Sequence, residues 1–235
     1  MSSKKRVFTI YGIFAILIIG IFIFLFNHTT KIVLLDVEGY TPIKNDPLAR
    51  EFAPSIIAQA EEDEPIGLYY RAAKDEFGNT YIAYHFLWEK EVNNNKGIKP
   101  FLNRILYTGG LKLQSKIFGK GDIEVIEVKL NANDEIVQVT YEIPEDYDEN
   151  DFSVKHETIV KNDNISYPLK FKVASWNHLF EYVDGKNEIS SDYKEYKLVP
   201  NYFADELWNE YEMVKEKEKI LKKSRAHFEY ERISY

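Results

Sequence analysis

The spacing of hydrophobic positions changes along this chain, and each spacing predicts a different element. The first pattern is an uncharged apolar run, Val7–Phe26. About 20 such residues in a helix span the roughly 30 Å hydrocarbon core of a bilayer, and a helix satisfies its own backbone polar groups there. A cleaved signal peptide is the alternative interpretation, but this run is longer than such a segment and no small-residue cleavage pattern follows it. The run therefore predicts one transmembrane anchor.

Basic residues at the N-terminus predict the orientation of this anchor. Lys4, Lys5 and Arg6 precede the apolar run, and positively charged flanks remain in the cytoplasm. We therefore expect a single-pass protein of the cell membrane, with residues 1–6 as a cytoplasmic tail and residues 27–235 exported. The receiving compartment stays open between the extracellular face, the periplasm and an organelle lumen.

Beyond the anchor, the spacing of two that is typical of strands dominates. The clearest case is a hairpin of Ile66–Ala73 and Thr80–Trp88, and both faces of its second strand are apolar, which predicts a central strand covered on both sides. His85 in that strand is expected to be a core residue. Further strands are expected at 31–37, 121–130, 136–143, 154–160 and 169–174.

Two segments have helical patterns. Asp46 and Pro47 are typical of an N-cap and a first helical residue, and Pro54 should end that short helix. From about 203 to 225 apolar residues recur near helical spacing among Glu and Lys, which predicts an amphipathic helix. We expect it to pack on the domain's own sheet, with docking on a partner as the alternative. The predicted fold is mainly β: an antiparallel β-sandwich with a C-terminal amphipathic helix, preceded by one transmembrane helix.

Composition narrows the function. The chain carries a formal net charge of −8, and because the tail holds three basic residues and the anchor no charge, the exported part carries −11. Such a surface repels nucleic acid. The chain has no cysteine, which excludes disulfides, thiolate metal sites and cysteine nucleophiles. An apolar core must therefore stabilise the domain.

Two carboxylates form the main candidate site. Asp122 and Glu124 share one strand face with the apolar residues that follow, which places an acidic pair at the mouth of the packed layer. Oxygen ligands of this kind suit a divalent cation such as calcium or magnesium. The alternative is an acidic strand end that faces solvent or pairs with Lys112 or Lys120.

A second candidate is the acidic stretch from residue 145 to residue 157. Asp146, Asp148, Asn150 and Glu157 occupy positions 1, 3, 5 and 12 of a calcium-loop pattern. Position 6 is Asp151 instead of the glycine that the sharp turn requires. The flanks are also predicted strands, so a solvated acidic hairpin loop is the stronger interpretation.

Three segments together resemble the broad family of necrosis-inducing-protein-like and vacuolar-sorting-related β-sandwiches. They are LAREFAPSIIAQAEEDEP with LYYR, then KGDIEVIEVKL, then YPLKFKVASWNHLF. The resemblance implies that Asp122 and Glu124 match an acidic pair that helps to hold a divalent cation, and that His178 matches a downstream histidine. Ile123 replaces the family's tryptophan, and Gly119 stands where the toxin branch has a metal-binding histidine.

These observations favour a non-enzymatic domain that binds an extracytoplasmic ligand or protein, aided by a divalent cation at Asp122, Glu124 and His178. The chain holds no Gly-x-Ser-x-Gly elbow, His-Glu-x-x-His motif or phosphate loop. The alternative function is a membrane-tethered hydrolase of envelope glycan that uses Asp122 and Glu124 as acid and base.

Overall fold

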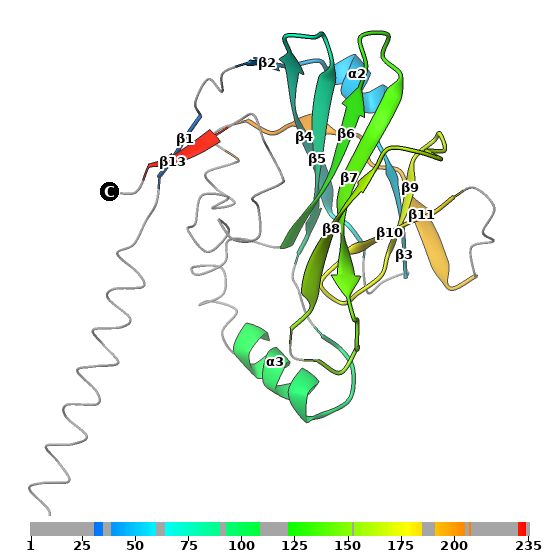
Figure 1. The fold of residues 1–235 in the computed structure, drawn as a ribbon. Coiled ribbons are helices and arrows are strands. Elements are labelled where there is room, and N and C mark those ends of the chain that lie inside the picture. Colours follow the sequence, from blue (N-terminus) through cyan, green and yellow to red (C-terminus); the bar gives the residue numbers. More distant parts are fainter. Residues whose placement is uncertain are drawn as a thin grey trace, which may run out of the picture.

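The computed structural model is mainly β, with two sheets whose strands are mostly antiparallel (Figure 1). It describes residues 31–34, 39–59, 64–89, 93–108, 122–151, 153–184, 191–204, 207 and 230–233. A separate antiparallel pair joins β1 (Lys31–Leu34) to β13 (Tyr230–Ile233).

The larger sheet has seven strands in the order β12-β4-β5-β6-β7-β8, with β2 also paired to β4. All pairs are antiparallel except β12 with β4. The central strand β5 is buried at every position but Tyr81, so apolar residues cover both of its faces. The strands are β2 (Tyr40–Ile43), β4 (Gly67–Asp75), β5 (Thr80–Trp88), β6 (Asp122–Leu130), β7 (Ile136–Glu145), β8 (Lys155–Lys161) and β12 (Asn201–Tyr202).

The smaller sheet has four strands in the order β10-β9-β3-β11, and only β3 with β9 is parallel. Its strands are β3 (Ser55–Gln59), β9 (Lys170–Val173), β10 (Phe180–Tyr182) and β11 (Tyr193–Tyr196).

Aromatic side chains from the two sheets pack against each other and form the core. Phe86 of β5 meets Phe180 of β10 edge to face, with ring centroids 6.1 Å apart. Tyr141 of β7 meets Phe171 of β9 in the same way at 5.0 Å. Such pairs add about 0.5–1.5 kcal/mol each beyond the burial of their area, and they fix how the strand ends of the two sheets meet.

The predicted hairpin and the four strands that follow it are confirmed, with ends shifted by one or two residues. His85 is buried and packs edge to face on Phe203, with ring centroids 5.2 Å apart. The short helix α2 (Asp46–Glu51) is present, but its N-cap is Asn45. The Asn45 side chain accepts a hydrogen bond from the Leu48 amide at 3.2 Å, which corrects the assignment of the cap to Asp46.

A second helix, α3 (Ile98–Thr108), occupies a stretch to which the sequence assigned no element. It lies at one end of the sheets, below the β7–β8 loop in Figure 1. Ile98, Phe101 and Leu102 of this helix are exposed, so these three apolar residues do not point into the core.

Several predictions fall on residues outside the described ranges. The anchor Val7–Phe26 lies there, and none of the described helices is both long and apolar enough for a membrane span. Most of the predicted helix at 203–225 lies there as well. Its first residue, Phe203, is described but is not helical: the Phe203 ring stacks on Tyr69 of β4, with centroids 4.9 Å apart.

Candidate functional site

Asp122 and Glu124 open strand β6 and lie on its inner face, toward the smaller sheet. Asp122 is opposite Trp88 in the register, and Glu124 is opposite Phe86, which packs on Phe180. The side chain of Asp122 is 14% exposed, and Glu124 is 4% exposed. The two carboxylates therefore line the inner layer, as their spacing of two residues predicted.

His178, in the loop between β9 and β10, reaches Asp122 directly. Its Nδ1 lies 2.7 Å from Oδ2 of Asp122. Its ring stacks on Trp88 with centroids 4.5 Å apart and planes 7° from parallel. The structure thus brings together two of the three residues that the sequence proposed as cation ligands, and it joins them to each other.

The loop that carries His178 is a tight turn built on Ser175. The Ser175 carbonyl accepts from the His178 amide at 3.0 Å, and its hydroxyl accepts from the Leu179 amide at 3.2 Å. His178 has φ of 61°, a left-handed conformation that costs energy for a residue with a side chain. The contacts of the ring to Asp122 and Trp88 hold the residue there.

A second carboxylate–histidine pair binds the same loop from its other side. His156 of β8 places Nδ1 2.7 Å from Oε2 of Glu142 on β7. Its Nε2 lies 3.2 Å from the amide nitrogen of Asn177, and the Ser175 hydroxyl donates to Oδ1 of Asn177 at 2.6 Å. Since Asn177 donates through its nitrogen, His156 accepts at Nε2 and donates from Nδ1 to Glu142.

These two pairs attach the Ser175–Leu179 loop to strands on both sides of it. Strands β6 and β7 are paired through their backbones from Leu130–Ile136 to Glu127–Thr140. Outside this paired part, the side chain of His178 bonds to Asp122 of β6, and the side chain of Asn177 bonds to His156 of β8. Ser175, Asn177 and His178 are all buried, so we assign the network a structural role: it holds this loop in one conformation.

The neighbouring loops are tied to one another by side chains that bond to backbone carbonyls. Asn93 donates from Nδ2 to the Glu149 carbonyl at 2.8 Å, and Asn95 donates to the same carbonyl at 3.1 Å. Arg104 of α3 donates to the carbonyls of Asn93 and Asn95 at 2.8 and 2.7 Å. The β7–β8 loop, the segment before α3 and α3 itself therefore form one connected end of the domain, which we call the loop end.

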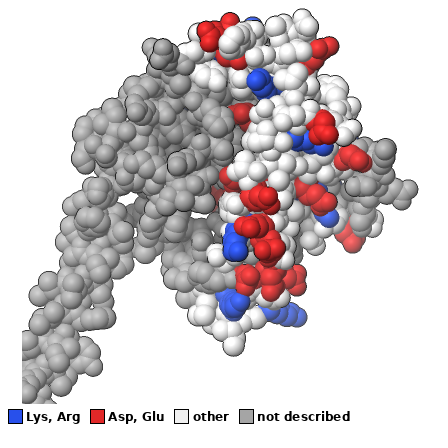
Figure 2. All heavy atoms as spheres, viewed as in Figure 1, with Lys and Arg blue, Asp and Glu red and all other residues white. Residues whose placement is uncertain are grey.

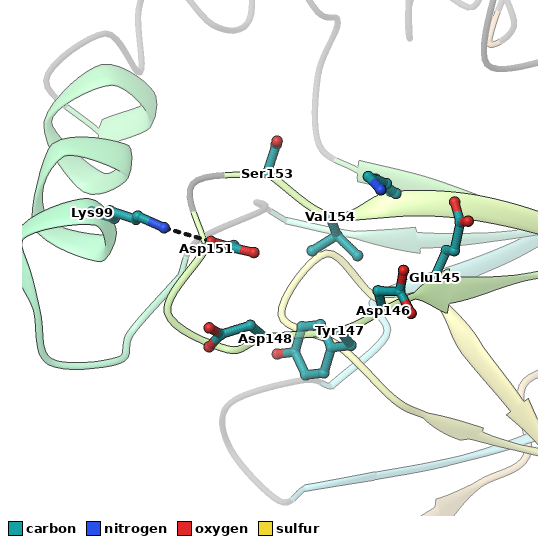
Figure 3. Close-up of a pocket in the computed structure, with 9 residues that line it drawn as sticks. Lys99, Glu145, Asp146, Tyr147, Asp148, Asp151, Ser153 and Val154 are labelled. Carbon is teal, nitrogen blue, oxygen red and sulfur yellow. Dashed lines mark hydrogen bonds and ion pairs between the residues drawn. The ribbon is translucent and has the colours of Figure 1, made fainter.

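The loop end contains an acidic hollow of about 330 Å³ beside the β7–β8 loop (Figure 3). Lys99 contacts Asp151 there at 2.7 Å. Oδ1 of Asp148 accepts from the Asn150 amide and side chain at 2.8 and 3.1 Å, and these hydrogen bonds lower the pKa of Asp148. The acidic hollow is lined by Lys99, Glu145, Asp146, Tyr147, Asp148, Asp151, Ser153, Val154 and Lys155.

The calcium-loop pattern thus has competing interactions at two of its positions, because Asp148 binds Asn150 and Asp151 binds Lys99. Acidic side chains are concentrated over the lower part of the face in Figure 2, with a few basic side chains among them. Asp146, Asp148 and Asn150 are exposed, which is consistent with a solvated acidic loop.

A second hollow of about 240 Å³ shares the lining residue Tyr147 with the acidic hollow. We call it the amide hollow because three carboxamide side chains contribute to it. Its lining residues are Gln59, Asn94, Asn95, Tyr147, Glu149, Val173, Ala174, Ser175, Trp176 and Tyr193. The pinned Ser175–Leu179 loop therefore contributes directly to the wall of this hollow.

Within the described part of the chain, no three His, Asp or Glu side chains lie close enough together to hold a metal ion. Asp122 is bonded to His178, and Glu124 is buried, so these residues as they lie do not fit a cation. The cation site stays a prediction. In comparisons with known proteins, the chain matches no protein-family model, no curated protein and no solved structure.

The sequence missed the second pair and the hollows. Glu142 and His156 are 14 residues apart on neighbouring strands, and only the strand register shows that they meet. A local signal existed for the loop, because four polar or aromatic residues directly follow the predicted strand at 169–174, namely Ser175, Trp176, Asn177 and His178. That cluster is what marks the segment as more than a plain turn.

Proposed function

We propose that this chain is a membrane-anchored, exported β-sandwich domain that binds a ligand or protein partner at its loop end and does not catalyse a reaction. The observation that carries this proposal is the fixed Ser175–Leu179 loop beside two open hollows. Binding surfaces that are held in shape before binding lose less entropy when the ligand arrives. The carboxylate–histidine pairs and the side-chain ties to backbone carbonyls supply that rigidity.

The anchor and the orientation in this proposal rest on the sequence alone. The apolar run Val7–Phe26 and the basic residues before it support a single span with the N-terminus in the cytoplasm. The resemblance to the necrosis-inducing-protein-like and vacuolar-sorting-related sandwiches is a further proposal. The contact of Asp122 with His178 supports it, since the resemblance singles out both residues.

The hydrolase alternative has less support. Its acid and base would be Asp122 and Glu124, but Asp122 is bonded to His178 and Glu124 is 4% exposed. A glycan must reach both carboxylates from opposite sides of the scissile bond, and neither side chain lines one of the hollows. The geometry therefore favours binding over glycan cleavage.

Site-specific photo-crosslinking tests the proposed function. A photoreactive phenylalanine analogue at Tyr147, which lines both hollows, is expected to form adducts with the ligand or partner in cells that make the protein. The matched control is Phe77, which is 76% exposed in the β4–β5 turn at the opposite end of the sheets. Equal labelling at the two positions, or none at Tyr147, would contradict the proposal.

Metal addition tests the predicted cation site. With Asp122 and His178 in contact, we expect calcium and magnesium to leave the melting temperature of the full chain unchanged relative to chelator. A cation bound only by the folded state would instead add about 2.7 kcal/mol at a hundredfold excess over Kd. A rise that disappears in the variant Asp122→Asn/Glu124→Gln would establish the site and overturn this expectation.

A further inference from the structure

The amide hollow has polar groups that are available to a ligand. Among the described residues, no hydrogen bond or ion pair involves the carboxamides of Gln59 and Asn94 or the carboxylate of Glu149. Each carboxamide offers an acceptor oxygen and two donor hydrogens.

The charges of this hollow disfavour ions of either sign. Among the described residues, the lining contains Glu149 and no lysine or arginine, and the acidic β7–β8 loop is adjacent, so an anion is repelled. Organic cations bind on aromatic faces, but the ammonium of Lys172 already lies 4.6 Å from the centroid of the Tyr193 ring. A second cation at that ring would meet a like charge. The amide hollow therefore suits an uncharged ligand better than an anion or an organic cation.

The volume of the amide hollow and its aromatic lining residues narrow the chemical class of the ligand. Pockets for drug-sized ligands hold about 300–1,000 Å³, and this hollow holds about 240 Å³, so it suits one small ring. Hydroxyl groups both donate and accept, as carboxamides do. Tyr147, Trp176 and Tyr193 are among the residues that line the same hollow. Aromatic side chains combine an apolar face with a polar edge, which match the C–H face and the hydroxyl rim of a pyranose.

We propose that the amide hollow binds a neutral saccharide unit, with Gln59 and Asn94 as hydrogen-bonding residues and Tyr147 and Trp176 as the aromatic wall. This inference rests on the proposed function, because it names the ligand class for the same loop end. The fixed Ser175–Leu179 loop holds Trp176 in place: the backbone amide of Trp176 donates to the hydroxyl of Tyr147 at 3.3 Å. The two aromatic residues therefore form one connected wall.

Titration of the full chain with defined sugars tests this inference. The protein is purified in a polyoxyethylene detergent, which has no sugar head group, and tryptophan fluorescence is followed with glucose, galactose, mannose and N-acetylglucosamine. The same four sugars displayed on polyacrylamide raise weak affinity through multivalency. We expect saturable binding of at least one sugar, and no binding of tetramethylammonium or inorganic phosphate.

Substitution locates the binding. Gln59→Ala/Asn94→Ala removes two exposed carboxamides and should weaken the Kd for the bound sugar about tenfold, because each lost hydrogen bond contributes a few-fold. The control Asn133→Ala removes an exposed asparagine from the β6–β7 turn at the other end of the sheets and should leave the Kd unchanged. Equal melting temperatures of the three proteins show that folding is preserved.

Three results would overturn the inference: no saturable sugar binding, preferential binding of either ion, or an unchanged Kd in Gln59→Ala/Asn94→Ala. The crosslinking at Tyr147 separates this failure from that of the proposed function. Adducts at Tyr147 without sugar binding reject the saccharide and leave the loop end as a binding surface. If neither adducts at Tyr147 nor sugar binding is observed, both the binding surface at the loop end and its saccharide ligand are rejected.

Discussion

Replacing His178 with alanine is expected to lower the free energy of unfolding by about 2–3 kcal/mol, because it removes a buried hydrogen bond to the carboxyl group of Asp122. Asp122 would lose the nitrogen that lies 2.7 Å from its Oδ2, and Trp88 would lose the ring stacked on it. Alanine would also have to adopt the left-handed backbone of this position, at φ of 61°. Urea unfolding of the full chain, followed by tryptophan fluorescence, measures the loss.

Two further variants separate the pair from its surroundings. Asp122→Asn keeps an acceptor for His178 and should cost less than His178→Ala. His156→Ala removes the histidine of the second pair and should also cost less, because His156 lies in strand β8, where alanine adopts the backbone without the left-handed conformation that residue 178 requires. An equal decrease in the free energy of unfolding in all three variants would show that the Asp122–His178 contact does not stabilise the loop more than the other contacts do.

The sequence predicted the long strands correctly. β5 and β6 have nine residues each and are buried on both faces, and such apolar runs between turn residues are typical of central strands. The short strand β3 was missed because it has only five residues, and so short an apolar run does not distinguish a strand from a helix. Helix α3 was missed because its apolar residues Ile98 and Phe101 are exposed and do not mark a face that packs on the core.

Only part of the candidate site could be predicted. Asp122 and Glu124 were found because their spacing places them on one strand face ahead of an apolar row. The contact of Asp122 with His178 joins residues 56 positions apart, and it depends on how the two sheets meet, which no local pattern contains. The resemblance paired these residues without giving the contact. The amide hollow could not be predicted either, because five separate segments of the chain form its walls.

A buried glutamate on the other face of β6 makes stability depend on pH. Glu127 lies between Ala83 and Thr140 in the register and is 3% exposed. Its Oε2 has no hydrogen-bond partner within the described ranges. Burial raises the pKa of Glu127 from its usual 4.5 to about 7, and Lys129 opposes this only in part. The folded protein therefore holds a proton near neutral pH that the unfolded chain releases.

This pKa predicts a loss of stability as the pH rises. Below pH 4.5 Glu127 is protonated in both the folded and the unfolded protein, so its stability contribution does not change with pH. Between pH 4.5 and about 7 the unfolded chain releases this proton and the folded protein retains it, so the free energy of unfolding falls as the pH rises. At about 1.4 kcal/mol per tenfold change in proton affinity, the total loss from Glu127 is ~3 kcal/mol.

Glu127→Gln should remove this decline and stabilise the full chain by up to ~3 kcal/mol at about pH 8, while changing little at about pH 4.5. Glutamine keeps the shape and the polar atoms but carries no charge, so the burial cost of the ionised carboxylate disappears. The control Glu76→Gln, at an exposed glutamate in the β4–β5 turn, should follow the wild-type curve. Urea unfolding across this pH range measures all three proteins, and a decline in Glu127→Gln parallel to that of the wild type would show that another group titrates instead.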